Sequence, residues 1–376
     1  MIKKIFKMTT IAIVSIILLL FIVGFIFMNT SPQFGGQPTQ EQKLAYAATG
    51  HYEDGKFINQ VPSPMDVGLK DIPSLLYQQI KGDPDRQPSV KFDVQKIDSL
   101  EIEQKPDSIT RLTWFGHSAF LLEIAGKKIL LDPMFGDVPA PHPWLGKSRY
   151  SNGLPIEIEK LPQIDAIIMS HDHYDHLDYG SIMRLKGKTK QFYMPLGVGA
   201  HFRKWGVSDE HIHELDWWDD IQLDSLKFTC TPARHFSGRG FGDRATTLWC
   251  SWVIQSPEKN IYFSGDSGYA PHFKEIGEKF GGFDFAMMEC GQYNEKWRSI
   301  HMMPEETIQA AVDVKAKVTQ PIHWGAFTLS LHSWTDPIER ATKEAAKRGV
   351  TLCTPEIGEA VVIGQEYPAG RWWERY

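Results

Sequence analysis

The chain has 376 residues, of which 42% are hydrophobic and 23% are charged, and its formal net charge is −6. These values are typical of folded proteins, and they exclude a mainly disordered, collagen-like or polytopic membrane protein. The acidic balance disfavours a nucleic-acid partner, because nucleic-acid binders are usually basic. The four cysteines form no Cys-x-x-Cys pair, so neither a disulfide scaffold nor a structural zinc ribbon is expected.

Residues 1–30 are predicted to form a single-pass membrane anchor. Three lysines within the first seven residues precede an apolar run from Ile11 to Met28. As a helix this run is about 27 Å long, which is enough to cross the hydrocarbon layer. The basic flank should stay in the cytosol, so the rest of the chain is expected on the extracytoplasmic side. A cleaved signal peptide is the alternative, although its apolar core is usually shorter and its cleavage site closer than the small residues near 45–48.

Residues 31–106 are predicted to form an extension that packs on the main domain. This segment is polar and is interrupted by prolines at positions 62, 64, 73, 84 and 88. A segment of this composition buries too little apolar surface to form a core of its own. One short helix is expected near residues 74–80.

Residues 107–376 are predicted to form one large α/β domain. Its expected strands are residues 109–115, 119–124, 128–131, 166–169, 191–194, 226–231, 248–254, 261–264 and 285–288. Its expected helices are residues 179–185, 304–314 and 337–348. Strands in series with helices between them predict layered sheets with helices outside.

The strongest motif is His171-Asp172-His173-Tyr174-Asp175-His176, which follows an apolar strand directly. In extended backbone the side chains of His171 and His173 leave on the same side. Asp175 and His176 are adjacent, so they project differently. One loop can therefore offer two imidazoles to one metal ion, and a carboxylate with an imidazole to a second. This donor set suits zinc, and also manganese or iron.

Three later residues, His235, Asp266 and His323, each follow a strand-like run and precede turn-like sequence. A lone histidine at a strand end is more often structural than a ligand, and Asp266 before Ser-Gly suits a simple turn. Their ordered appearance after the histidine motif favours metal ligation instead, because sites on α/β scaffolds gather at strand ends.

These residues resemble the signature of the metallo-β-lactamase superfamily, and the resemblance covers about residues 109–364. Further blocks narrow it to the branch of N-acylphosphatidylethanolamine-hydrolysing phospholipase D. These blocks are Pro32–Gly36, Trp114–Ser118, Leu131–Pro133, Glu214–Trp218, Phe263–Tyr269 and His323–Phe327. The anchor departs from the animal members of this branch, which lack a spanning segment, so their compartment is not carried over.

The resemblance implies an αββα sandwich with a two-zinc site at one edge, although another divalent metal remains an alternative. Carried over residue by residue, one zinc is held by His171, His173 and His235. The other zinc is held by Asp175, His176 and His323, and Asp266 bridges both.

His301 matches a family histidine near the substrate, with a surface or core histidine as the alternative. Asp132 and Asp165 are expected either to be strand-turn residues or to orient ligand imidazoles by accepting the distal ring proton. Trp372 and Trp373 are considered for the membrane interface, although a place in the core is the simpler interpretation.

The implied reaction is cleavage of the head-group-side phosphodiester bond of an N-acylphosphatidylethanolamine, giving phosphatidic acid and an N-acylethanolamine. A metal-bridging hydroxide would attack phosphorus. Asp175 would orient that hydroxide, and Asp266 would set the metal spacing. His301 would protonate the leaving alkoxide or hold a substrate oxygen.

A phospholipid and a membrane are therefore the expected partners, with the oligomeric state open and a homodimer as one possibility. Two alternatives stay open as well. One is a dizinc lactonase acting on a sugar-phosphate or acyl lactone. The other is a non-catalytic metal-binding protein, which would be marked by a lost ligand.

Overall fold

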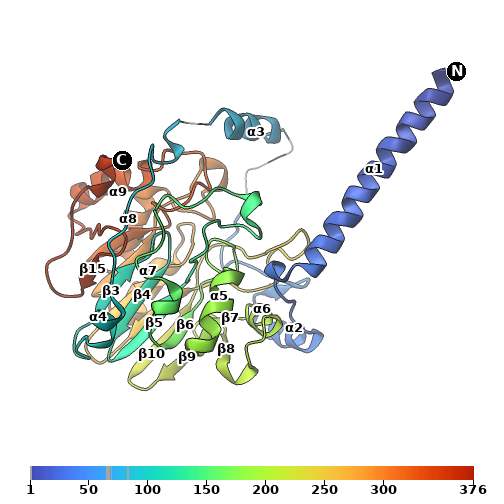
Figure 1. Ribbon diagram of the computed structural model, residues 1–376. Helices are drawn as coiled ribbons and strands as arrows, with labels where there is room; N and C mark the ends of the chain where they lie inside the picture. The colour runs from blue at the N-terminus through green and yellow to red at the C-terminus, as the bar shows by residue number, and fades with distance from the viewer. Residues whose placement is uncertain (1, 65–67, 69, 83) are drawn as a thin grey trace.

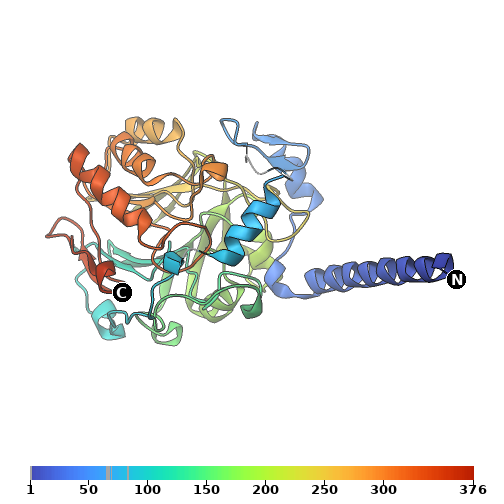
Figure 2. The ribbon, with the colours of Figure 1, turned by 90° about the horizontal axis from the view of Figure 1, so that it is seen from above.

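The computed structural model describes residues 2–64, 68, 70–82 and 84–376. Helix α1 (Ile2–Thr30) projects from the rest of the molecule, and the two termini lie at opposite ends in both views (Figures 1 and 2). Its segment Lys4–Thr30 is long and apolar enough to cross a membrane, and none of its most apolar window is buried. Length and composition alone do not separate such a helix from a signal sequence.

The described part of the main domain contains two sheets. The first has the strand order β15-β3-β4-β5-β6-β7-β8, with parallel pairing from β5 to β8. Its strands are β3 (Arg111–Trp114), β4 (Phe120–Ile124), β5 (Lys127–Leu131), β6 (Ile164–Ile168), β7 (Thr189–Pro195), β8 (Ile212–Leu215) and β15 (Ala360–Val362).

The second sheet has the order β14-β13-β12-β11-β10-β9, with parallel pairing from β12 to β14. Its strands are β9 (Asp220–Leu223), β10 (Leu226–Thr231), β11 (Ser251–Gln255), β12 (Asn260–Phe263), β13 (Phe285–Glu289) and β14 (Thr319–Ile322).

The two sheets pack face to face with helices on their outer sides. Along β4, Phe120 and Leu122 belong to the core between the sheets, whereas Leu121 between them belongs to the core under the helices. This alternation is what a strand buried on both faces requires. The covering helices are α5 (Tyr179–Leu185) and α6 (Gly199–Lys204) on the first sheet, with α7 (His272–Phe280), α8 (Pro304–Asp313) and α9 (Asp336–Arg348) on the other side. The expected αββα sandwich is confirmed.

Most of the expected elements are present within one to three residues, including α5, α8 and α9. Strands β8, β9, β14 and β15 and helices α6 and α7 were missed. Strand β14 has the sequence Thr-Gln-Pro-Ile, and a proline argues against a strand in the middle of a sheet. The proline is tolerated because β14 lies at the end of the strand order, where its outer side forms only the isolated bridge between Thr319 and Leu352 among the described residues.

The segment 31–106 contacts the main domain at several points. The backbone N–H of Gly36 donates to Nδ1 of His201 at 3.1 Å, and that of Phe57 donates to the carbonyl of Ala245 at 2.8 Å. Phe92 is buried in the core between the sheets. The segment also contains α2 (Gln40–Tyr46), the short strands β1 (Tyr52–Glu53) and β2 (Lys56–Phe57), α3 (Ile72–Lys81) and α4 (Ser99–Glu103).

Trp372 and Trp373 are core residues, so the interfacial alternative for them is wrong. They are only 6% and 2% exposed, and their rings pack against Trp324. Apolar packing around three tryptophans removes more surface from water than an interfacial position would.

Candidate metal centre

Seven side chains that the sequence singled out meet at one edge of the sandwich. The loop after β6 carries His171, His173, Asp175 and His176, whereas His235, Asp266 and His323 follow β10, β12 and β14. Because both sheets end at this edge, residues far apart in the sequence come into contact here.

His171, His173 and His235 form one set, which we call the three-histidine group. Nδ1 of His173 lies 2.9 Å from Nε2 of His171 and 3.2 Å from Nε2 of His235. Three ring nitrogens that converge in this way suit one metal ion with imidazole ligands.

Asp175, His176, Asp266 and His323 form a second set, which we call the mixed group. Nε2 of His323 lies 3.2 Å from Oδ2 of Asp175 and 3.1 Å from Oδ2 of Asp266. Nε2 of His176 lies 3.2 Å from Oδ1 of Asp266. Oδ2 of Asp266 is also 3.9 Å from His171 and 3.8 Å from His235, so this carboxylate stands between the two groups.

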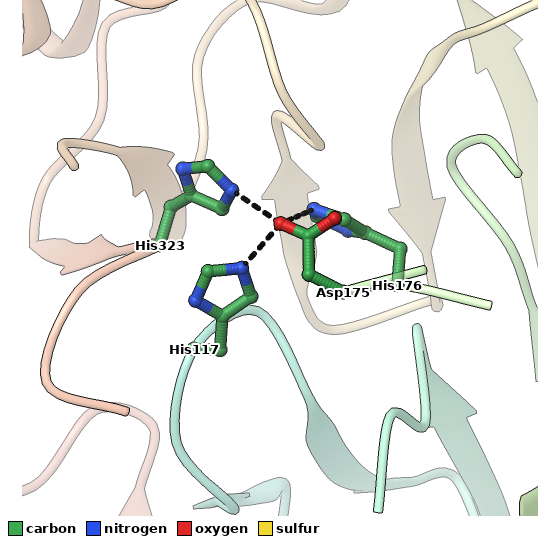
Figure 3. Close-up of side chains that lie close together, drawn as sticks. All are labelled: His117, Asp175, His176 and His323. Carbon is green, nitrogen blue, oxygen red and sulfur yellow. Dashed lines mark hydrogen bonds and ion pairs between the residues drawn. The ribbon is translucent and has the colours of Figure 1, made fainter. Parts of the chain in front are cut away.

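His117 joins the mixed group, although the sequence analysis assigned it no role. Its Nε2 lies 2.8 Å from Oδ2 of Asp175, and Figure 3 shows both His117 and His323 facing that oxygen. The ring is 1% exposed, and its residue has a left-handed φ of 54°. The sequence feature that could have identified His117 is its position in the turn Gly116-His117-Ser118 between two buried strands.

Asp132, directly after β5, orients two of the imidazoles. Its Oδ2 accepts hydrogen bonds from Nδ1 of His176 at 2.7 Å and from the hydroxyl of Ser170 at 2.5 Å. Because the Ser170 proton is used in this way, the hydroxyl oxygen accepts from Nδ1 of His171 at 2.9 Å. Both rings therefore have a proton on Nδ1 and leave Nε2 to face the centre.

Of the two expectations for Asp165, the strand-turn position is confirmed and the contact with a ligand imidazole is wrong. This residue lies near the start of β6, at the other end of the strand from the metal loop. Its carboxylate accepts from the backbone of Lys128 at 3.0 Å and from the ammonium of Lys190 at 2.9 Å. Asp165 thus stabilises the start of β6, and none of its hydrogen bonds within the described part of the chain reaches a candidate metal-binding residue.

Backbone carbonyls orient two further rings. Nδ1 of His235 lies 2.9 Å from the carbonyl of Ile300, and Nδ1 of His323 lies 3.3 Å from that of Gly291. A carbonyl only accepts, so each Nδ1 carries a proton and each Nε2 points toward the carboxylates.

His301 lies beside both groups. Its ring centre is 5.0 Å from that of His235 and 5.1 Å from that of His323. Its Nδ1 donates to Oε1 of Glu289 at 2.8 Å, and Glu289 is fully buried at the end of β13. The sequence analysis missed Glu289, whose strand reads as ordinary core up to that residue.

The surroundings shift the pKa values of the centre in two directions. Burial holds the pKa values of His171 and His235 well below their usual range. Burial acts the same way on His176, but the charges of Asp266 and Asp175 outweigh it and raise its pKa to about 10. Burial alone would raise the pKa of Asp266, yet the neighbouring imidazoles hold it well below its usual range. Without a metal, the positive charge beside the carboxylates of the mixed group is therefore a proton on an imidazole such as that of His176.

The donor atoms fit divalent metal ions. Nε2 of His176 and Oδ1 of Asp266 are buried and have no aligned hydrogen-bond partner among the described residues. Such orphaned atoms are costly, and a cation between them satisfies both. Imidazole nitrogens together with carboxylate oxygens are common ligands of zinc and related ions.

Comparisons with known proteins agree with this chemistry. The family described as "Beta-lactamase superfamily domain" matches residues 127–324, which include all seven residues of the two groups. An uncharacterized protein of Mycobacterium tuberculosis is 38% identical over 328 residues, covering 86% of this chain and 87% of that protein. The mitochondrial N-acyl-phosphatidylethanolamine-hydrolyzing phospholipase D of Saccharomyces cerevisiae is 32% identical over 295 residues, covering 74% of this chain and 62% of that protein.

The fold has relatives among solved structures as well. The isothiocyanate hydrolase from Delia radicum gut bacteria aligns with a TM-score of 0.53 at 22% identity, covering 67% of this chain and 98% of that protein. At this identity the likeness concerns the fold alone. The family match and the gathered histidines and carboxylates point the same way: the chain belongs to the beta-lactamase superfamily and is one of its metal-dependent hydrolases.

Proposed function

We propose that the chain is a dizinc phosphodiesterase of the phospholipase D type. Its substrate would be an N-acylphosphatidylethanolamine, cut on the head-group side to give phosphatidic acid and an N-acylethanolamine. The yeast relative, which is named for this activity, supports the proposal over 74% of the chain. The apolar helix α1 supports it too, because it would hold the domain at a membrane.

In this proposal the three-histidine group holds one zinc, and Asp175, His176 and His323 hold the other. Asp266 would contact both zinc ions, and its position between the two groups supports this role. When bound, the two cations activate water and neutralise the non-bridging oxygens of the phosphate. An acidic chain with this site needs that positive charge to receive a phosphodiester.

The position of His301 is the observation that best supports cleavage of a phosphodiester with proton transfer to the leaving oxygen. The ring lies within about 5 Å of both groups, close to the imidazoles of His235 and His323. Glu289 accepts from Nδ1, so Nε2 is the nitrogen left to transfer a proton to the leaving oxygen of the N-acylethanolamine. The fully buried carboxylate of Glu289 fixes the orientation of the ring through this hydrogen bond. Asp175 in turn accepts from His117 and is positioned to orient the attacking water.

A product assay on the purified full-length protein tests the proposal. Metal analysis should find close to two zinc ions per chain. Mass spectrometry should find phosphatidic acid and N-acylethanolamine from N-acylphosphatidylethanolamine. Phosphatidylcholine, phosphatidylethanolamine and a set of acyl and sugar-phosphate lactones form the comparison panel. Rapid lactone opening with no lipid turnover would replace this function by the lactonase alternative.

We further propose that α1 is an uncleaved anchor and that the hydrolase domain lies outside the cytoplasm. The lysines before the apolar run support this orientation. Protease added to intact cells or spheroplasts should digest the domain. An N-terminus retained in the purified protein, read by mass spectrometry, would exclude signal cleavage. A domain protected until the membrane is opened would contradict the orientation.

A further inference from the structure

Several large apolar side chains are exposed where α1 meets the main domain. Phe241 is 93% exposed, Trp144 is 72% exposed and Leu145 is 48% exposed. Together with Phe27 of α1 they line one groove of about 470 Å³. We call these four residues the membrane-proximal face. Single exposed apolar residues are ordinary, but a contiguous set marks an interaction surface.

The depth of this groove along α1 identifies what would cover it. Its α1 wall is formed by Gly24, Phe27 and Met28, the last turn of the apolar run. With a rise of about 1.5 Å per residue, Gly24 lies about 6 Å inside the end of that run. When α1 spans a bilayer, this wall lies at the boundary between hydrocarbon and head groups. The facing side chains of Trp144 and Phe241 must then lie at the same level.

Ring contacts attach one of the two loops to the helix. The ring centre of Phe27 is 4.9 Å from that of His142, 6.0 Å from that of Trp144 and 5.6 Å from that of Phe34. The loop that carries His142 and Trp144 therefore packs against α1. Tryptophan at the end of a spanning helix is the usual composition of a membrane interface.

The second loop is tied to the metal loop. Arg239, two residues before Phe241, is buried, and its guanidinium donates to the carbonyls of Asp172 at 2.5 Å and Leu177 at 2.8 Å. The same guanidinium lies 4.0 Å from the ring centre of Tyr174, which also lines the groove. The position of Phe241 is thus coupled to the segment that carries His173 and Asp175.

We propose that the membrane-proximal face inserts into the interface of the bilayer that α1 enters. Insertion fixes the domain at two further points besides the helix, so the metal loop is held at the lipid surface rather than free to rotate about a single tether. Delivery of a lipid to the metals through this arrangement rests on the proposed phospholipase function, whereas insertion rests only on the proposed anchoring by α1.

Site-specific probes test the insertion. The described cysteines are all buried, so an environment-sensitive fluorophore can be attached to an introduced cysteine. Phe241→Cys and Trp144→Cys report on the face. Leu100→Cys is the matched control, because Leu100 is an apolar residue that is 56% exposed in α4, at the end of the domain remote from α1 (Figures 1 and 2).

The full-length variants are placed in nanodiscs of phosphatidylethanolamine and phosphatidylglycerol. Emission at positions 144 and 241 should shift to the blue and be quenched by lipids that carry a spin label near the head group. The label at position 100 should emit as in water. Equal quenching at positions 241 and 100 would overturn the inference.

A second measurement separates this inference from the proposed function. Phe241→Ser should lower turnover of N-acylphosphatidylethanolamine in bilayers about tenfold relative to turnover of a water-soluble phosphodiester. Leu100→Ser should leave that ratio unchanged, and thermal unfolding verifies the fold of both variants. Quenching without any lipid turnover would support insertion and contradict the phospholipase. Lipid turnover with no quenching and no change in the ratio would support the phospholipase and contradict insertion.

Discussion

Nε2 of His117 lies 2.8 Å from Oδ2 of Asp175, the oxygen that also faces Nε2 of His323 at 3.2 Å. Burial lowers the pKa of His117 to about 3, so its ring is neutral and has a single proton. The carboxylate only accepts, which places that proton on Nε2. Nδ1 is buried with no hydrogen-bond partner in the described part of the chain, as a bare acceptor nitrogen would be. His117, in the turn between β3 and β4, therefore positions Asp175 of the metal loop.

Replacing His117 should reduce both activity and metal retention. His117→Ala removes the donor to Asp175, and loss of such an outer partner typically costs about 10-fold to 100-fold. His117→Gln keeps an amide donor and should recover part of the loss. Metal content after dialysis and kcat give the two readouts. A His117→Ala protein with parental zinc content and parental kcat would contradict the positioning role.

Asp266→Ala should abolish hydrolysis while the fold remains. The substitution removes a carboxylate that approaches both groups, so Nε2 of His176 and Nε2 of His323 lose the oxygens that lie 3.2 Å and 3.1 Å away. We expect kcat to fall by at least about 10³-fold, as for loss of a principal electrostatic group. Zinc per chain should fall from two toward one. Circular dichroism serves as the control for folding, and an active Asp266→Ala protein would rule out the bridging assignment.

Asn59 of the extension should hold the backbone of His235 in place. Its amide nitrogen donates to the carbonyl of His235 at 2.8 Å, and its oxygen accepts from the backbone of His235 at 3.1 Å and from Trp249 at 3.0 Å. Asn59→Ala leaves the backbone N–H and carbonyl of His235 without these partners, whereas Trp249 keeps its bond to the carbonyl of Ala233, and we expect a cost of about 1–3 kcal/mol in the free energy of unfolding.

Denaturant unfolding and zinc affinity measure the effect of Asn59→Ala together. Gln60→Ala, at the neighbouring and exposed position, is the matched control and should change neither quantity. If the two variants behave alike, the extension does not contribute to the metal centre through Asn59.

The metal-free protein should lose stability as the pH rises above neutral. Asp266 and Asp175 outweigh burial and raise the pKa of His176 from 6.5 to about 10 in the folded state. A raised pKa stabilises the folded state fully below the unfolded value of 6.5, and this contribution is lost as the pH rises toward 10.

Chelator-treated protein should therefore have a lower Tm at pH 9 than at pH 7, whereas zinc-loaded protein should change less because the metal replaces the proton. Zinc binding at pH 7 should also release protons, which calorimetry in buffers of different ionisation enthalpy would detect. A chelated protein that becomes more stable between pH 7 and pH 9 would contradict this account.

Features that depend on residues close together in the chain could be predicted from the sequence. The apolar run of α1 and the helices α5, α8 and α9 are local patterns, and so is the metal loop, where four donor side chains lie within six positions. The family resemblance extended this to His235, Asp266 and His323, because their order along the chain follows the superfamily signature.

The groups that support those donors could not be predicted from the sequence, because they come from distant parts of the chain. His117 reaches Asp175 across 58 positions, Asp132 reaches His176 across 44, and Asn59 reaches His235 across 176. The same packing buries Trp372 and Trp373 and leaves Trp144 and Phe241 exposed beside α1. Local spacing carries no information about such contacts, because they arise only when two sheets and the extension close around a common edge.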